Sequence, residues 1–362
     1  MERKSVSILL GVPIFFLINL RNRIGRLFRK NNDLVVIIAF HKIGDTVFTI
    51  PTVERIVAKE KNVHLFCFYH SVPIYQLVLK DNIRFVPFSK MDFKYGERVA
   101  KADIRRQFKQ LNPSKIIDIT GSTKSVSTFI FNNANQITGF NSTFYKTLYT
   151  NFYSGNNIEH IIELYPRKLG WMPEISIDEL LSRFSIVPRN SGPILIHPFA
   201  GWASKEWGLN KFIVLAQRLQ KIKDCEILIP EGSLSDAILE EINFLSIKVI
   251  KTENIDKLIY HINNAFLLIG NDSGSIYIAD LLGVPNFTIF GPSNPKVHFF
   301  KLKYSDYINI ELPCSPKGFE KLCFTDGGRS GCPSNECMQQ LSVDIVYHKI
   351  LQLIERIEKN YE

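Results

Sequence analysis

The feature that most constrains the fold is a repeated alternation of short β-branched runs with longer amphipathic segments. The alternation begins at residue 34, continues to residue 169 and restarts at residue 194. Parallel strands joined by crossover helices are the usual outcome of this pattern. A stretch rich in Pro, Ser and Gly at residues 185–193 separates the two series and is predicted to be a linker. We therefore expect two doubly wound α/β domains in tandem.

The first series predicts strands at residues 34–40, 63–68, 83–87 and 115–120, and helices after residue 45 and at residues 72–80, 97–110 and 158–169. The second predicts strands at residues 194–198, 225–230, 248–250, 266–270 and 286–290, and helices at residues 209–222, 234–244, 254–264 and 274–282. A loop rich in Cys, Gly and Pro (312–337) and a helix (342–359) close the chain. The domain boundaries expected from this pattern are 1–33, 34–187, 188–340 and 341–362. A chain of 362 residues is long enough for two domains that each bury a core.

The basic residues are concentrated at the N-terminus. The formal net charge is +9, and residues 1–30 carry +6 of it. This distribution argues against a nucleic-acid partner and favours an anionic membrane surface. The apolar run Val6–Leu20 has 15 residues, short of the roughly 20 that span a bilayer. We interpret residues 1–33 as an interfacial leader on the cytoplasmic face of the inner membrane. A span or uncleaved signal, or a buried structural helix, are the alternatives.

The six cysteines fall into two groups. Cys67 and Cys225 lie in apolar, strand-like runs, which predicts core packing. The other four share the late loop, and only the last pair approaches the spacing of a zinc site. Disulfides would need an oxidising compartment, and no export signal is recognisable. We therefore predict thiols that pack in a crowded loop and no metal site, with metal binding by this cluster as the alternative.

The common nucleotide and hydrolase motifs are missing from the sequence. It contains no G-x-G-x-x-G, no Gly-Lys dipeptide of a Walker A loop, no G-x-S-x-G and no H-E-x-x-H. Their absence weighs against nicotinamide oxidoreductases, P-loop kinases, α/β-hydrolases and zincins. Ligands of doubly wound domains bind outside the carboxyl ends of the strands. Candidate residues are therefore sought in the loops that follow strands.

Three of these loops carry polar groups suited to chemistry. The first places Asp45 at the start of a helix, where a carboxylate can act as a base or simply cap the helix. The second loop contains Lys205, which could bind a diphosphate or be a solvated surface lysine. The third, Gly270–Tyr277, joins a strand to a helix whose N-terminal N–H groups can bind an anion. Asp272 or Ser273 would otherwise only cap that helix.

These loops belong to a set of four longer segments, which in chain order are IGDTVFTIPTVERI, HPFAGWASKEWGLNKF, NDSGSIYIADLLGVP and IFGPSNP. Together, the four segments resemble the family 9 glycosyltransferases, whose best-known members are the ADP-heptose:lipopolysaccharide heptosyltransferases. The resemblance covers about residues 34–355. It implies a GT-B fold, with two Rossmann-like domains facing an interdomain cleft, the acceptor on the 34–187 side and the nucleotide sugar on the 188–340 side. It further implies inverting transfer from ADP-heptose to an inner-core lipopolysaccharide or lipooligosaccharide acceptor, with no cofactor and no metal.

The resemblance also implies roles for particular residues. Asp45 matches the catalytic aspartate. The donor-side positions are Ser204, Lys205, Asp272, Ser273, Gly274, Ser275 and Tyr277. Lys124 matches an acceptor-side lysine, and His41 and Lys42 beside Asp45 are further candidates for an anionic, lipid-linked acceptor.

The chain departs from the family pattern at two places in these segments. Tyr277 stands where the family usually has His, and Gly208 stands where members often have Pro. Tyr cannot carry a positive charge, so these changes leave the donor and the acceptor open. The alternatives are a GT-B enzyme that uses another nucleotide sugar, a nucleotide-sugar epimerase, or an inactive membrane-bound scaffold with the same fold.

Overall fold

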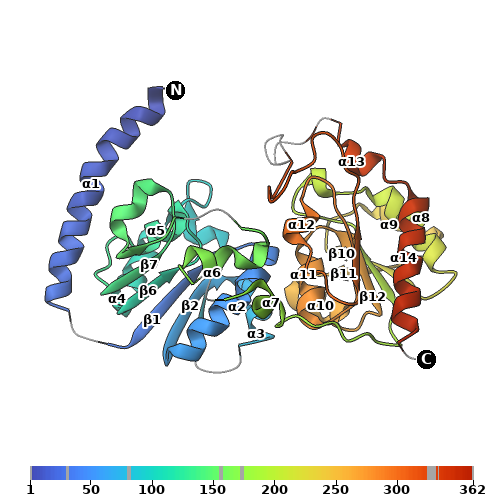
Figure 1. Ribbon diagram of the computed structural model, residues 1–362, viewed down its shortest axis with the longest axis horizontal. Coiled ribbons are helices and arrows are strands. Elements are labelled where there is room, and N and C mark those ends of the chain that lie inside the picture. Colours follow the sequence, from blue (N-terminus) through green and yellow to red (C-terminus); the bar gives the residue numbers. More distant parts are fainter. Residues whose placement is uncertain are drawn as a thin grey trace. The chain divides into compact units, whose positions relative to one another are not determined.

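The chain forms two compact units, each built around one parallel β-sheet (Figure 1). The computed structural model describes residues 2–29, 32–79, 83–154, 158–171, 175–323, 332 and 334–360, with side chains from residue 14 onward. Unit 1 comprises Met1–Asn156 and Glu163–Ser176, and unit 2 comprises Asn157–Ile162 and Ile177–Glu362. The two α/β units confirm the predicted fold class.

The six strands of the unit 1 sheet are all parallel and have the order β3-β2-β1-β6-β7-β8. They are β1 (Leu34–Ala39), β2 (Asn62–Phe68), β3 (Ile83–Phe88), β6 (Lys115–Asp118), β7 (Gln136–Gly139) and β8 (Asn151–Phe152). Every residue of β1 is buried, which explains its uninterrupted apolar sequence. The strand order reverses between β1 and β6, so their carboxyl ends form the switch point where doubly wound folds bind ligands.

The helices of unit 1 are α1 (Glu2–Leu27), α2 (Ile43–Lys59), α3 (Val72–Gln76), α4 (Ala102–Leu111), α5 (Thr123–Phe129) and α6 (Leu164–Lys168), with 3₁₀ turns η1 (Tyr69–Ser71), η2 (Lys90–Asp92), η3 (Thr143–Leu148) and η4 (Ile161–Glu163). The helix expected at 97–110 starts later, because β4 (Phe93–Lys94) and β5 (Val99–Ala100) form a hairpin. The helix expected at 158–169 is shorter than predicted, because the helical residues there run only from 161 to 168. Residues 157–162 belong to unit 2, and only the short α6 follows η4.

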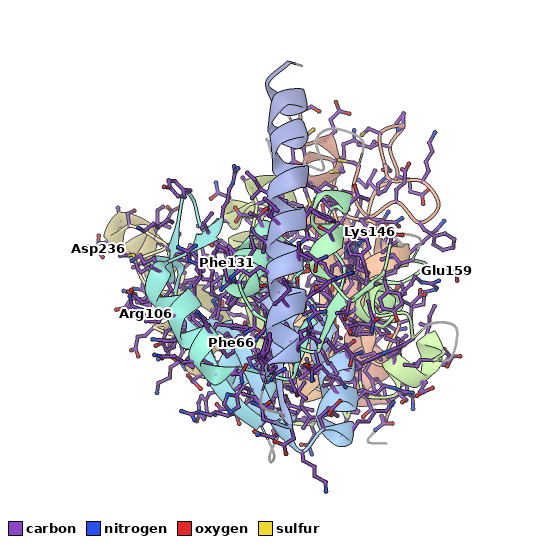
Figure 2. All side chains as sticks on the ribbon, turned by 90° about the vertical axis from the view of Figure 1, so that its left-hand side faces the viewer. Phe66, Arg106, Phe131, Lys146, Glu159 and Asp236 are labelled. Atoms are coloured by element: carbon purple, nitrogen blue, oxygen red, sulfur yellow. The ribbon has the colours of Figure 1, made fainter. Side chains whose placement is uncertain are left out.

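Helix α1 packs lengthwise on unit 1 (Figure 2). The Phe15 ring lies 5.0 Å from the Phe144 ring and 5.3 Å from the Tyr145 ring. Further along, Asn22 Nδ2 donates a hydrogen bond to the Ile130 carbonyl at 3.0 Å. The predicted apolar run falls within this helix, although its first eight side chains lie outside the described ones. In the part of the chain that the structure describes, none of the helices combines the length and apolar character that a membrane crossing requires.

The unit 2 sheet repeats the topology of unit 1, with six parallel strands in the order β11-β10-β9-β12-β13-β14. They are β9 (Ile194–His197), β10 (Cys225–Pro230), β11 (Lys248–Thr252), β12 (Leu267–Asn271), β13 (Asn286–Ile289) and β14 (Ser305–Ile308). The strand order reverses between β9 and β12. Unit 2 therefore has its own switch point at the carboxyl ends of these two strands.

The helices of unit 2 are α7 (Ile177–Leu181), α8 (Leu209–Leu219), α9 (Asp236–Phe244), α10 (Ile255–Asn263), α11 (Gly274–Leu282), α12 (Pro295–His298), α13 (Glu336–Gln339) and α14 (Val343–Glu358), with the 3₁₀ turn η5 (Ala203–Lys205). Helix α14 confirms the predicted closing helix. Its buried residues Val346, Ile350, Leu353 and Ile357 recur every three or four positions and complete the apolar core of this unit.

The two isolated cysteines are buried as predicted, Cys67 in β2 and Cys225 in β10. The late cysteine-rich loop is described only in part, because residues 324–331 and 333 lie outside the described residues. Within the described ranges, no group of three or more His, Cys, Asp or Glu side chains is arranged to hold a metal ion.

Candidate active site

Each unit presents candidate residues at its own switch point. In unit 1, Asp45 follows β1 and Lys124 follows β6. In unit 2, Lys205 follows β9 and Asp272 follows β12. Residues far apart in the sequence thus meet at one edge of each sheet, which is where ligands of doubly wound folds bind.

In unit 2, a buried carboxylate holds the candidate cation. The Lys205 ammonium forms an ion pair with Asp272, and it lies 4.5 Å from the centroid of the Trp202 ring. The Asp272 side chain is 1% exposed and that of Lys205 is 13% exposed. Tyr277 donates its hydroxyl to the other carboxylate oxygen of Asp272. The buried Asp272 carboxylate therefore positions both Lys205 and Tyr277. Of these three side chains, that of Lys205 is the one that reaches solvent.

The charge of this group is fixed by its surroundings. Burial raises the pKa of the Asp272 carboxyl, but the positive charges of Lys205 and His298 outweigh burial and hold that pKa well below its usual range. Burial lowers the pKa of His298, and the negative charge of Asp272 opposes this effect. Sequence reasoning missed His298, although it follows the FGPSNP segment that carried part of the resemblance. Asp272 is thus ionised near neutral pH, with its charge compensated by Lys205.

The start of α11 lies directly after Asp272. Ser273 is the N-cap residue in extended conformation, and its hydroxyl pairs with that of Ser275 at 2.9 Å. Gly274 is the first helical residue. Backbone N–H groups at the start of such a helix favour an anion. Ser204 is buried in η5, next to Lys205 in the chain.

Asn271 braces this site and was not predicted. Its side-chain oxygen accepts from the Trp207 backbone N–H at 3.0 Å, and its Nδ2 donates to the Pro198 carbonyl at 2.7 Å. These bonds tie both ends of the loop that carries Lys205 to β12. Gly208 in the same loop has φ of +107°, which proline cannot adopt. Proline at this position would therefore be incompatible with the backbone of this loop.

In unit 1, Asp45 lies half-buried in the first turn of α2. The Thr46 hydroxyl donates to the Lys42 carbonyl at 2.9 Å and lies 2.9 Å from the Ser71 hydroxyl. These bonds fix the start of the helix against η1. A carboxylate at this end of a helix is stabilised by the helix dipole. Lys42 itself is the exposed N-cap residue.

His41 and Tyr165 form a buried pair beside Asp45. The Tyr165 hydroxyl lies 3.4 Å from His41 Nδ1, and the ring centroids are 5.1 Å apart. Burial, and then the negative charge of Asp45, raise the pKa of Tyr165 well above its usual range. Asp45 is therefore close enough to act electrostatically on this hydroxyl. Tyr165 lies in α6 and was not among the predicted site residues.

Lys124 lies in the first turn of α5, also near His41. Its Nζ donates to Glu97 Oε2 at 3.0 Å and lies 4.5 Å from the centroid of the Phe68 ring. Burial, and to a smaller extent the positive charges of Lys168 and Lys124, lower the pKa of His41 to about 3, although a hydrogen bond with the backbone of Ile119 opposes this shift. The edge of the unit 1 sheet thus combines two half-buried carboxylates, Asp45 and Glu97, with several cations.

The turn before Lys124 is organised by Asp118, which is fully buried. Its Oδ1 accepts from the backbone N–H groups of Thr120 and Gly121, both at 3.0 Å. Its Oδ2 accepts from the Ser125 hydroxyl at 2.8 Å and the Tyr149 hydroxyl at 2.6 Å. Gly121 has φ of +63°, and a Cβ there would come within 2.1 Å of the Phe140 ring. This turn therefore requires both the carboxylate and the glycine.

His41 leads to a prediction about acid stability. The unfolded chain binds a proton to this histidine below a pH of about 6.5, whereas the folded chain keeps it neutral down to about 3. Its contribution to stability is therefore present above pH 6.5 and is lost as the pH falls through this window. We expect His41→Gln to reduce the fall in unfolding free energy between pH 6.5 and 5.5 by about 1 kcal/mol. Urea unfolding at both pH values measures the unfolding free energy of the two proteins. If that free energy fell equally in both between pH 6.5 and 5.5, the prediction would be contradicted.

Comparisons with known proteins agree with this fold. The sequence profile of glycosyltransferase family 9 (heptosyltransferase) matches residues 103–323. Lipopolysaccharide heptosyltransferase 1 of Campylobacter coli is 22% identical over 76% of this chain and 89% of its own length.

Two solved structures from E. coli are similar in fold over nearly their whole length. ADP-heptose LPS heptosyltransferase II has a TM-score of 0.65 and 14% identity, over 90% of this chain and 99% of its own. Heptosyltransferase WaaC with ADP-2-deoxy-2-fluoro heptose has a TM-score of 0.61 and 16% identity, over 88% of this chain and 99% of its own. The profile match covers more than half of the sequence, and the chain therefore belongs to glycosyltransferase family 9 and is a glycosyltransferase with the GT-B fold.

Proposed function

We propose that this enzyme transfers heptose from ADP-heptose to an inner-core sugar of lipopolysaccharide or lipooligosaccharide, with inversion at the anomeric carbon. Family membership supports heptose as the transferred sugar. The names of the Campylobacter and E. coli relatives support lipopolysaccharide as the acceptor class. The complex of WaaC with a fluorinated ADP-heptose supports ADP as the nucleotide.

Inversion requires the acceptor hydroxyl to attack the anomeric carbon as the diphosphate leaves from the opposite face. Asp45 takes the proton of that hydroxyl, because its half-buried carboxylate lies in the first turn of α2, directly after the loop at the carboxyl end of β1. Lys205 and the N–H groups at the start of α11 stabilise the charge that develops on the diphosphate. These groups supply the neutralising charge, so the reaction requires no metal ion.

The acceptor is anionic and is bound by cations of unit 1. Lys124 is the principal candidate, because Glu97 and the Phe68 ring hold its ammonium in a defined place. Lys42 adds an exposed positive charge three residues before Asp45. His41 is buried and neutral, so its contribution is to support Tyr165 and the loop rather than to carry charge.

The observation that carries this proposal is the position of Lys205, which Asp272 holds beside the N-terminal N–H groups of α11 at the unit 2 switch point, where a diphosphate can bind. Purified enzyme should be tested with ADP-heptose, UDP-sugars and GDP-sugars on heptose-free lipooligosaccharide, with product linkage determined by NMR. We expect turnover with ADP-heptose and an inverted linkage. Turnover with UDP- or GDP-sugars and none with ADP-heptose would overturn the assignment of the donor.

A GT-B enzyme with a different nucleotide sugar is the second candidate, and Tyr277 is the observation that favours it. The family usually has His at this position. Here the buried tyrosine donates to Asp272 but cannot carry a positive charge near the donor. The same donor screen distinguishes the two candidates.

The enzyme acts as a peripheral protein on the cytoplasmic face of the inner membrane, where α1 provides the contact. The face of α1 opposite Phe15, Ile18 and Asn22 carries a row of apolar side chains that we call the outward stripe. It consists of Phe16, Leu17, Leu20, Ile24 and Leu27, which are 46% to 80% exposed. At 3.6 residues per turn, Arg21 and Arg23 fall on the two edges of this stripe. An apolar face bordered by arginines is typical of a helix that lies in the membrane interface.

Removing apolar character from the outward stripe should therefore release the enzyme from membranes. We expect Phe16→Ser, Leu20→Ser and Ile24→Ser together to weaken binding to anionic vesicles at least about tenfold. Vesicle sedimentation measures this, and an unchanged melting temperature shows that the fold is intact. The matched control carries Val187→Ser, Ile222→Ser and Phe244→Ser, which are apolar positions in unit 2 at least as exposed as those of the stripe. Equal losses in both variants would argue against a membrane role for α1.

A further inference from the structure

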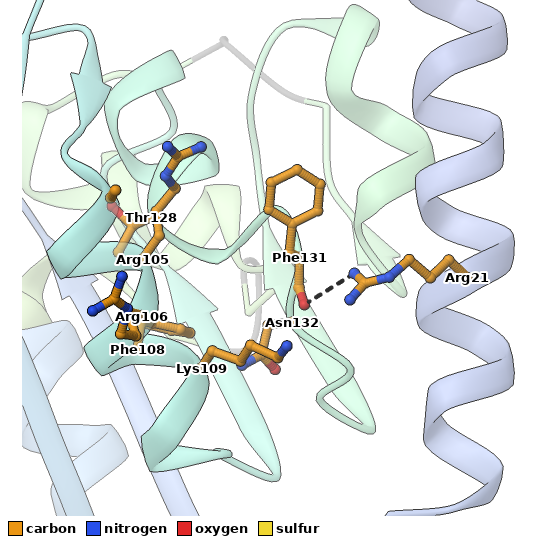
Figure 3. A pocket seen from close by; sticks show the side chains of 9 residues that line it. Arg21, Arg105, Arg106, Phe108, Lys109, Thr128, Phe131 and Asn132 are labelled. Atoms are coloured by element: carbon orange, nitrogen blue, oxygen red, sulfur yellow. Dashed lines mark hydrogen bonds between the residues drawn. The ribbon is translucent and has the colours of Figure 1, made fainter.

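A basic pocket in unit 1 lies outside both switch points. It has a volume of about 360 Å³ and is formed between α1, α4 and the segment after α5 (Figure 3). Four of its lining residues are cations, namely Arg21, Arg105, Arg106 and Lys109. The transfer reaction proposed above makes no use of them.

The cations of this pocket are not neutralised by the protein. In the described ranges, none of the four forms an ion pair with a carboxylate, in contrast to Lys124 and Lys205. Arg21 is held at the rim by Phe131, with its guanidinium 5.6 Å from the ring centroid and 3.5 Å from the carbonyl oxygen. Arg105, Arg106 and Lys109 come from α4, so helices distant in sequence meet at this pocket. A pocket with this much uncompensated positive charge selects an anion.

The position of the pocket identifies the source of the anion. Arg21 forms one edge of the outward stripe and also lines the pocket. Figure 2 looks onto α1, and the labelled Phe131 and Arg106 lie together on one side of this helix. Exposed apolar side chains border the pocket, which suits a bilayer better than a nucleic acid or a soluble metabolite. Guanidinium groups bind phosphate oxygens in bidentate fashion.

We infer that this pocket binds the phosphate of an anionic phospholipid headgroup while the outward stripe enters the adjacent acyl layer. The inference rests on the proposed membrane association and goes beyond it, because it assigns a defined headgroup site to α4. If positive charge spread over the whole surface attracted the membrane, binding would not depend on any particular cation. The pocket, by contrast, makes Arg105 and Arg106 more important than other cations at similar exposure.

The test compares two charge-matched variants of the full chain on vesicles of phosphatidylcholine with and without phosphatidylglycerol. One carries Arg105→Gln and Arg106→Gln in the pocket. The control carries Lys61→Gln and Lys94→Gln, which are exposed in unit 1 and do not line the pocket. We expect the pocket variant to bind phosphatidylglycerol vesicles about tenfold more weakly than the intact chain, and the control to change less than about twofold. Arg105→Lys with Arg106→Lys keeps the charge but not the bidentate geometry and should restore part of the binding, which separates lost charge from lost folding.

The possible results separate this inference from the membrane proposal. If the intact chain binds no vesicle, both fail. If it binds but the pocket variant and the control lose affinity equally, only the headgroup site is overturned, because delocalised charge is then sufficient. Isothermal titration with inorganic phosphate addresses a soluble ligand. Phosphate binding that the pocket variant abolishes, together with unchanged vesicle affinity, would make this a soluble-anion site and would also overturn the inference.

Discussion

Asp45→Asn is expected to lower kcat by a factor of about 10² to 10⁴ while the Kd of the donor changes less than about twofold. The amide is similar in size to the carboxylate and retains an oxygen at the start of α2, but it cannot accept the acceptor proton. Donor binding depends on residues of unit 2, so it should persist. Single-turnover kinetics together with calorimetric titration of the nucleotide sugar measure both quantities.

A second aspartate provides the control for this substitution. Asp236 also lies in the first turn of a helix, α9, and is exposed far along the chain in unit 2. Asp236→Asn removes the same favourable interaction with a helix dipole, which is typically worth 0.3–1 kcal/mol, and should leave kcat unchanged. If Asp45→Asn retained full activity, another group would have to accept the proton, and Asp45 would be a helix-stabilising residue only.

The two sheets were predictable because a parallel strand that is buried on both faces has a continuous run of apolar residues in the sequence. β1, β9 and β12 are such strands, and each was expected within one residue of its observed start. The loops that follow them then placed Asp45, Lys205 and Asp272 at the sheet edges without knowledge of side-chain contacts. The short strands β7 and β8 were missed, because strands of four and two residues carry too little periodicity to be distinguished from a loop.

The supporting residues of the site could not be predicted in the same way. His298 affects Asp272, and Tyr165 meets His41, only because segments far apart in the chain converge in space. His298 ends the short helix α12 and Tyr165 lies in the short helix α6, and neither helix has a local pattern that indicates the partner of its side chain. The hairpin of β4 and β5 was missed for another reason. Its turn places Tyr95, Gly96 and Glu97 at positive φ, and two of these residues have no preference for it. The same limit applies to the basic pocket, whose cations lie on helices far apart in sequence.

Lys205→Met is expected to weaken donor binding at least about tenfold and to lower kcat as well, because the lysine charge meets a diphosphate that becomes more negative in the transition state. The same change leaves the buried Asp272 carboxylate without its ion-pair partner. Breaking one side of a buried pair typically destabilises a protein by 3–5 kcal/mol. A loss of activity alone would therefore not distinguish a missing donor contact from a destabilised loop.

The double variant Lys205→Met with Asp272→Asn separates these two effects. Removing the carboxylate charge together with its partner should recover most of the unfolding free energy in urea, because no uncompensated charge stays buried. Tyr277 can still donate to the amide oxygen at residue 272. Donor binding should remain as weak as in the single variant, because the cation is still missing. Recovery of donor affinity along with stability would show that Lys205 is a structural partner of Asp272. Loss of wild-type turnover on treatment with EDTA would show instead that a metal ion neutralises the leaving diphosphate.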